Sequence, residues 1–247
     1  MTSQLNNVTV VMNFVCTEEK RLNFVLKNIV DWASVLEDCH FNINFNDSIN
    51  LAPIQNIFEK NIPKLNFSNM QEKDFALTTY NISTDIKTPY VLFLCEDCIF
   101  NMTKDDLSNI LQEVADKDVD FVNLTKLEKY NRSNYRKQGK YVEGKYGHFY
   151  KGRNSPSSRL SIQAMFKTEL WLNYFKNFLE NRDRPWPHSL KFKYTNLPNC
   201  IEGYYDFSLG PQKNPLFTEL NCYIPKKIIF DHWDETKQKY TYIKNEI

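Results

Sequence analysis

A short apolar run in the first half of the chain ends abruptly at two neighbouring acids. The run spans residues 90–94, the acids are Glu96 and Asp97, and apolar residues resume at Ile99. A continuous run of aromatic and β-branched residues predicts a strand that is buried on both faces. Burying carboxylates at its end would be costly without a cation nearby. The pair therefore marks either a ligand site at a strand end, where open α/β sheets bind their ligands, or a solvated turn.

Strand and helix patterns alternate along the first half of the chain. Helical spacing predicts helices within 17–36, 54–58, 74–86 and 103–114, and apolar runs predict strands at 8–15, 41–45, 63–67, 90–94 and 119–124. This alternation predicts an α/β fold with a mostly parallel, twisted sheet and helices on both faces. Later in the chain we expect strands at 160–166, within 191–212 and at 222–230, and a helix at 167–179.

The alternation changes character after residue 127. We expect one domain over 1–247, with a regularly alternating half at 1–127 and a more irregular half at 128–247. Between 128 and 159 the chain is basic, rich in tyrosine and without a clear period. A segment of this length is typical of a functional lid or of a solvated, flexible face, and a lid would suit an anionic ligand.

Composition excludes several classes of protein. The formal net charge is +1, so no overall field favours nucleic acid or an anionic membrane, and the 6 glycines include no Gly-rich phosphate motif. No apolar run is long enough for a membrane helix, and no secretory signal is visible, so we expect a cytoplasmic protein, in the host cytoplasm if it is viral. Cys95 and Cys98 form a lone C-x-x-C, which favours small packing residues over a zinc or redox site.

Three stretches, in this order, resemble nucleotide-sugar glycosyltransferases of the GT-A type from bacterial and viral capsule or glycan biosynthesis. The first is the opening strand and turn, V-T-V-V-M-N-F-V-C-T-E-E-K-R-L from Val8. The second, F-A-L-T-T-Y-N from Phe75, is similar to the family's A-x-x-x-N helix, and the strand ending in acids that follows resembles its D-x-D or E-D-D motif. The third, L-S-I-Q-A-M-F-K-T-E-L from Leu160, resembles the S-x-Q-P-x-x-W-[RK]-x-x-x-L segment. Together they cover most of residues 8–180. The resemblance implies one GT-A-like domain over 1–247, with a nucleotide-sugar-binding half at 1–127 and an acceptor-side half at 128–247.

The chain departs from the family pattern at two positions. Cys98 stands where the family usually has another acid, and Ala164 replaces the usual proline. With one acid fewer, the site loses a candidate metal ligand. A weak metal site, a metal-independent enzyme and a degenerate transferase therefore all stay open.

The resemblance implies transfer of a sugar from a nucleoside-diphosphate sugar to an acceptor hydroxyl on a glycan. A divalent cation, Mn²⁺ or Mg²⁺, would stabilise the leaving pyrophosphate and would take oxygen ligands. We expect Asp97 to bind the metal and Glu96 to bind sugar hydroxyls or ribose, because adjacent residues of an extended chain point to opposite sides. The resemblance also implies that His232, in a polar cluster after a late apolar run, returns to the metal or pyrophosphate.

Other positions would complete the donor site. Asn13 in the opening strand and Asn81 in the A-x-x-x-N stretch belong to segments that the resemblance assigns to nucleotide binding. Asp47 follows the second strand, where the family commonly places an acid on the base or ribose; capping the turn is its other role. His148, within the basic segment, is a further residue that could contact phosphate.

An inverting transfer needs a general base for the acceptor proton. Glu169, Glu180 and Asp183 all lie beyond the third stretch, and we choose Asp183 because residues 181–187 resemble a loop rather than a helix interior. A retaining mechanism stays open. The basic segment 128–159 would then close over donor or acceptor as a lid.

Two alternatives compete with this interpretation. A nucleotidyltransferase also joins an α/β sheet to acidic metal ligands, but it usually opens with a Gly-rich basic loop, and the turn after Val15 has no glycine. A degenerate transferase fold that binds carbohydrate or protein without catalysis stays open because of Cys98. A nucleic-acid-binding role ranks third, because the net charge is near zero.

Overall fold

The computed structural model describes a set of segments spread along the whole chain. These are residues 4–14, 26, 30–45, 52–70, 74–94, 98–100, 103–124, 140–142, 144–151, 159–160, 164–181, 190–191, 201–205, 217–219, 229–234 and 239–243. The turn that follows the first strand, most of the helix expected within 17–36, and the acids after the run 90–94 lie outside these segments.

The elements of the first half follow the predicted alternation closely. In chain order they are η1 Gln4–Asn7, β1 Val8–Phe14, β2 His40–Phe45, α2 Ala52–Asn61, β3 Leu65–Ser68, α3 Phe75–Asn81, β4 Tyr90–Leu94, β5 Cys98–Phe100, α4 Lys104–Asp116 and β6 Phe121–Asn123. Residues 30–35 are also helical. The strands predicted at 8–15, 41–45 and 90–94 are confirmed within a residue or two.

The second half contains mainly short strands and one long helix. They are β7 Lys140–Val142, β8 Gly147–Lys151, β9 Arg159–Leu160, β10 Ala164–Lys167, α6 Thr168–Asn181, β11 Leu190–Lys191, β12 Ile201–Tyr205, β13 Phe217–Glu219, β14 Ile229–Asp234 and β15 Lys239–Ile243. The prediction of an irregular segment at 128–159 was wrong in part, because β7 and β8 form an antiparallel pair inside it. The helix predicted at 74–86 ends at Asn81.

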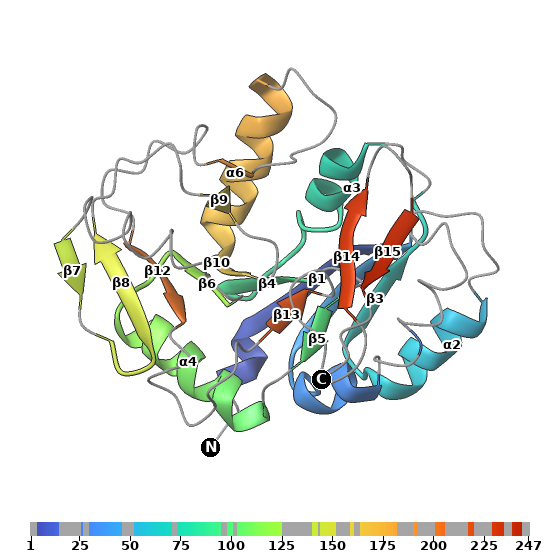
Figure 1. The fold of residues 1–247 in the computed structure, drawn as a ribbon, viewed down its shortest axis with the longest axis horizontal. Coiled ribbons are helices and arrows are strands. Elements are labelled where there is room, and N and C mark those ends of the chain that lie inside the picture. The colour runs from blue at the N-terminus through green and yellow to red at the C-terminus, as the bar shows by residue number, and fades with distance from the viewer. Residues whose placement is uncertain are drawn as a thin grey trace.

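One nine-stranded sheet organises the described chain, in the order β3-β2-β1-β4-β10-β6-β12-β8-β7 (Figure 1). Strands β3, β2, β1 and β4 are parallel neighbours. β10 is antiparallel to both β4 and β6, and β8 is antiparallel to both β12 and β7, while β6 and β12 are parallel. β10 and β8 therefore run against the other strands, and the sheet is mostly parallel as predicted.

Two hydrophobic cores cover the two faces of this sheet. Alternate residues of β1, such as Val10 and Met12, pack with α4, α2 and residues 32–36, while Val11 belongs to a second core with α3 and α6. Figure 1 shows α3 and α6 above the sheet and α4 below it. We call these the α6 face and the α4 face. Every residue of β1 and β4 is buried, as expected for strands covered on both sides.

Local capping explains where two helices begin. Thr103 and Asp106 form a capping box at the start of α4, in which each side chain bonds the other residue's backbone N–H. Asp74 caps α3 by accepting the Leu77 N–H at 3.1 Å. Asp118, just beyond α4, adopts a positive φ of 55°, and the Val119 N–H reaches back to the Val114 carbonyl at 2.9 Å. This is a Schellman ending with aspartate in place of glycine.

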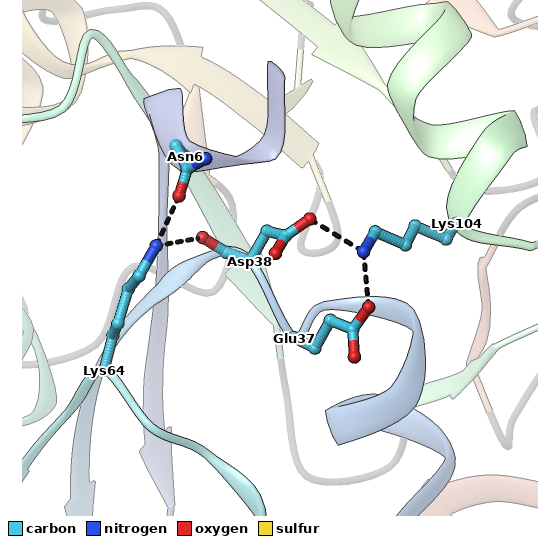
Figure 2. Close-up of polar contacts among 5 residues, drawn as sticks. All are labelled: Asn6, Glu37, Asp38, Lys64 and Lys104. Carbon is cyan, nitrogen blue, oxygen red and sulfur yellow. Dashed lines mark hydrogen bonds and ion pairs between the residues drawn. The ribbon is translucent and has the colours of Figure 1, made fainter. Parts of the chain in front are cut away.

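Lysine side chains tie the elements together at the amino ends of the parallel strands (Figure 2). Lys64, just before β3, donates to the Asp38 carbonyl at 2.9 Å and to the Asn6 side chain. Lys104, in the first turn of α4, pairs with Asp38 at 2.7 Å and with Glu37. Its hydrogen bonds to Asp38 and Glu37 raise the pKa of Lys104. The hydrogen bonds and ion pairs of these two lysines thus connect η1, α4 and the residues that precede β2 and β3.

Candidate functional site at the carboxyl ends of β1, β2 and β4

The carboxyl ends of the central parallel strands meet at one edge of the sheet. Leu94, the last residue of β4, is in register with Met12 of β1, and Phe14 at the end of β1 is in register with Phe45 at the end of β2. In open α/β sheets this edge is where ligands bind. We therefore expect the donor site at this edge, where the strand ends are aligned.

Two buried asparagines support this edge from the α6 face. Asn13 is 2% exposed and Asn44 is fully buried, and the Asn44 amide donates to the Asn13 Oδ1 at 3.1 Å. The Asn13 amide donates to Thr79 Oγ1 at 3.1 Å and to the Phe75 carbonyl at 3.3 Å. Because buried polar groups must be hydrogen-bonded, these contacts fix α3 against β1 and β2.

Asn44 also fixes the chain between β3 and α3. Its Oδ1 accepts the Met70 N–H at 2.7 Å and the Ser68 hydroxyl at 3.1 Å, and its amide donates to the Met70 carbonyl at 3.3 Å. Asn42, two residues earlier on the same face, donates to the Ile82 carbonyl at 2.7 Å. The alternation F-N-I-N-F in β2 therefore presents one amide to the carboxyl end of α3 and one to residues 68–70, at the end of β3.

The hydrogen-bonded chain continues into α6. Thr79 donates its hydroxyl to the Phe75 carbonyl at 2.7 Å, and its own carbonyl accepts the Ser83 hydroxyl at 2.6 Å. Trp171 of α6 then donates its indole N–H to Ser83 Oγ at 2.9 Å, in a fully buried position. Side chains from β2, β1, α3 and α6 thus form one connected set.

Sequence reasoning singled out Asn13 but not its partners Asn44, Thr79, Ser83 and Trp171. The available signal was the pair of amides in the apolar strand 41–45, since a buried amide requires a partner. The structure shows that the Asn13 side chain bonds within the protein, to Asn44 and to α3. Its contact with a nucleotide stays a prediction. Asn81 is exposed at the end of α3.

Four predicted site residues, Asp47, Glu96, Asp97 and Asp183, lie outside the described segments. The described chain brackets the acidic pair, because β4 ends at Leu94 and β5 begins at Cys98. β5 pairs with β13, and Cys98 is in register with Glu219.

His232 lies in β14, which pairs with β15. The ladder is regular as far as Asp231, opposite Thr241, and shifts register before Asp234, opposite Lys239. His232 therefore lies where the register of the ladder shifts. His148 lies in β8, in register with Tyr204 of β12.

Within the segments that the structure describes, no group of three or more His, Cys, Asp or Glu residues is placed to hold a metal ion. The expected ligands Glu96 and Asp97 are not among those residues. Their carboxylate oxygens match the preference of Mn²⁺ and Mg²⁺, so the donor set suits such a cation chemically.

The other described ion pairs lie away from the carboxyl ends of β1 and β4. Lys167, in register with Tyr90 at the start of β4, pairs with Asp118 at 2.7 Å and with Asp120 at 2.8 Å. Burial favours a lower pKa for Lys167, but its hydrogen bonds and ion pairs with these aspartates outweigh burial, and the pKa is raised. Burial likewise raises the pKa of the Tyr90 hydroxyl.

The chain is similar in fold to solved protein structures, but no similarity in sequence was found. No family model matches the chain, and no curated protein shows significant similarity to it. S. aureus TarS 1–349 in complex with UDP-GlcNAc matches with a TM-score of 0.52 at 11% identity, over 80% of this chain and 57% of that one. S. aureus TarS matches with a TM-score of 0.51 at 12% identity, over 80% and 36%. The complex of TarS 1–349 with UDP matches with a TM-score of 0.52.

The chain thus spans 57% of the TarS 1–349 fragment and 36% of the longer TarS chain. At 11–12% identity the similarity establishes the fold and nothing finer. The fold class is the α/β, GT-A-like one that the sequence predicted. A separate search of the described helices found none with the length and apolarity that a membrane span requires.

Proposed function

We propose that this chain is a glycosyltransferase that moves a sugar from a nucleoside-diphosphate sugar to an acceptor hydroxyl on a glycan. The observation that carries the proposal is the aligned carboxyl ends of β1 and β4, with Glu96 and Asp97 following β4 in the sequence after one residue, Cys95. The fold adds support, because it is shared with a protein whose structure contains UDP-GlcNAc.

In this proposal the acids after β4 hold the diphosphate end of the donor. Asp97 and His232 bind a Mn²⁺ or Mg²⁺ ion, and Glu96 binds ribose or sugar hydroxyls. When bound, the cation supplies positive charge that stabilises the departing nucleoside diphosphate. Asp47, two residues after β2 in the sequence, binds the base or ribose, and Asn81 contributes from the end of α3.

The asparagine pair has a positioning role in this scheme. Asn13 and Asn44 hold the start of α3 and residues 68–70 beside the carboxyl ends of β1 and β2. A rigid edge keeps the donor-binding groups at fixed separation, so less ordering is needed when substrate binds. On the acceptor side, Asp183 takes the proton of the attacking hydroxyl.

Glu219 offers a substitute for the acid that Cys98 lacks. Cys98 and Glu219 are in register in the antiparallel pair β5–β13. A carboxylate on the facing strand can serve the same ligand position as one at 98. We therefore include Glu219 as a third acidic group of the proposed metal site.

Thermal unfolding with a panel of UDP, UDP-GlcNAc, GDP and GDP-mannose, each with and without Mn²⁺, tests donor binding. A ligand at 100 times its Kd stabilises by about 2.7 kcal/mol, or roughly 5–10 °C for a chain of this length. We expect a shift of this size with one nucleotide, larger with Mn²⁺ than without it. Release of UDP or GDP from the sugar nucleotide then reports transfer to water.

A matched pair of substitutions locates the site. Asp97→Asn should remove the Mn²⁺-dependent part of the shift, whereas Asp85→Asn, in the exposed turn between α3 and β4, should leave it intact. If no nucleotide raises the melting temperature, the transferase proposal fails. Nucleotide binding without turnover would instead favour the degenerate binding module that Cys98 suggests.

A further inference from the structure

The position of helix α6 bears directly on the general base of the proposed transferase. Glu169 and Glu180 lie on α6, and Asp183, which we chose as the base, follows its last residue, Asn181, by two positions. Whichever of these acids takes the acceptor proton, its distance from the donor depends on where α6 lies. The contacts that hold α6 in place therefore matter for the transfer step.

The first residue of α6 is fixed far from the donor edge, by which we mean the carboxyl ends of β1, β2 and β4. The Thr168 N–H bonds the Pro89 carbonyl at 2.9 Å, and the Thr168 hydroxyl bonds the Thr88 carbonyl at 2.6 Å. Both carbonyls directly precede β4, so Glu169 lies near the amino end of that strand, away from the donor. Glu180 is exposed and lies about 17 Å further along the helix axis.

Trp171, three residues into α6, packs in an aromatic cluster on the α6 face. Its ring centroid lies 4.9 Å from that of Phe93, 4.9 Å from that of Phe166 and 4.6 Å from that of Phe175. Apolar packing is less directional than a hydrogen bond, and it leaves a helix more freedom to shift. The fully buried indole N–H adds a directional contact, because it donates to Ser83 Oγ at 2.9 Å.

The donor and acceptor roles are fixed at each step of the network that begins at this indole. An indole N–H can only donate, so Ser83 accepts it, and the Ser83 hydroxyl proton goes to the Thr79 carbonyl at 2.6 Å. The Thr79 hydroxyl proton goes to the Phe75 carbonyl at 2.7 Å, and the Thr79 Oγ1 accepts the Asn13 amide at 3.1 Å. Each hydroxyl has one proton, so loss of any link takes a partner away from a buried polar group.

The other end of this network is the donor edge. Asn13 is the next-to-last residue of β1, and its side chain accepts the Asn44 amide at 3.1 Å. Asn44 is the next-to-last residue of β2 and is fully buried. Three links, at Thr79, Ser83 and Trp171, therefore connect the donor edge to α6.

We propose that Ser83 and Trp171 are positioning residues of the transferase, which hold α6 and the acceptor-side base at a fixed distance from the donor edge. The inference rests on the proposed function and identifies what sets the geometry of its site. Glu180 lies about 14 Å further along the helix than Trp171, so a tilt of about 5° at Trp171 would move it by roughly 1 Å. A displacement of that size can slow a transfer by up to ~100-fold.

Steady-state kinetics on the full chain tests the proposal with UDP-GlcNAc and GDP-mannose as probes, each with Mn²⁺. Release of UDP or GDP is followed well below the melting temperature of every variant. Trp171→Phe keeps an aromatic ring and removes the N–H, and Ser83→Ala removes the acceptor of that N–H. Each should lower kcat by about tenfold or more, with the KM for the sugar nucleotide and the nucleotide-induced thermal shift unchanged.

Thr168→Val is the matched control, because it removes a hydrogen bond of the same helix whose partner, the Thr88 carbonyl, lies outside the network. The Thr168 N–H keeps its bond to Pro89, so the start of α6 stays in place. This variant should have a lower melting temperature and an unchanged kcat. Ser83→Ala decides the matter alone if Trp171→Phe does not fold.

Two results overturn the positioning role while the wild type is active. The first is a wild-type kcat in both Ser83→Ala and Trp171→Phe. The second is an equal loss of kcat in Thr168→Val, which would mean that weakening α6 at any point slows the reaction. A wild type that binds no sugar nucleotide, or binds one without releasing its nucleoside diphosphate, overturns the transferase proposal itself, and the positioning role falls with it.

Discussion

Removing the Asn13 side chain should cost a large part of the stability of this fold. Asn13→Ala deletes three hydrogen bonds, to Asn44, Thr79 and Phe75, at a position that is 2% exposed. At about 1 kcal/mol net for each bond, the free energy of unfolding should fall by about 3 kcal/mol. Asn44 keeps its contacts with Met70, so the remaining amide is only partly unsatisfied.

Urea unfolding followed by circular dichroism measures this change. Asn44→Ala should cost a similar amount, and the double variant should lose about 1 kcal/mol less than the sum, because the two residues share one direct bond. Asn61→Ala is the matched control: its amide donates to the Ile57 carbonyl of its own helix, at 2.7 Å, so the loss should stay near or below 1 kcal/mol. Strictly additive losses of less than 1 kcal/mol for Asn13 and Asn44 would refute the idea that this pair holds the edge together.

Three further outcomes follow from particular contacts. Gly144→Ala should lower the free energy of unfolding by about 1–3 kcal/mol in urea melts, because a Cβ there would lie 2.3 Å from the Gly147 carbonyl oxygen; an unchanged midpoint would contradict this. Cys39 should resist iodoacetamide at pH 8 in the native protein and react on unfolding, as mass spectrometry of the labelled peptide would show, since burial raises its thiol pKa to about 12. Glu219→Gln should weaken Mn²⁺ binding measured by EPR in the presence of UDP, and Cys98→Asp in that background should restore it; equal affinities in all three proteins would remove Glu219 from the site.

Much of the parallel half could be predicted because its signals are local. The run 90–94 is apolar throughout, and its strand has these bounds. The Thr103 and Asp106 capping box needs four consecutive residues, and it was recognisable without any tertiary information. Strand bounds and helix caps that depend only on residues close in the sequence were therefore predictable.

The antiparallel half was harder because its strands are specified by distant partners. β7 and β8 are embedded in a basic, tyrosine-rich segment, and β8 gains its place in the sheet from β12, some fifty residues later. The alternation in G-H-F-Y-K signals a strand only once Phe149 is known to be buried. The roles of Asp183 as general base and of Glu96 and Asp97 as ligands remain predictions, because these three residues lie outside the described segments.

The asparagine network illustrates a different limit. The family resemblance was enough to predict a role for Asn13. It gave no such signal for Trp171 and Ser83, whose hydrogen bond joins residues 88 positions apart. No sequence period connects them, because the contact exists only after α3 and α6 pack on the same face. Polar residues in apolar strands predict that a partner exists without identifying it.

The position of β10 has a consequence for how this chain is made. β10 comes from residues 164–167, yet it separates β4 from β6, which both precede residue 124. During synthesis, the edges of β4 and β6 that pair with β10 therefore stay unpaired until residues 164–167 have left the ribosome. A fragment truncated after residue 127 would expose those edges permanently and should aggregate, so the amino-terminal half should not be expressed alone.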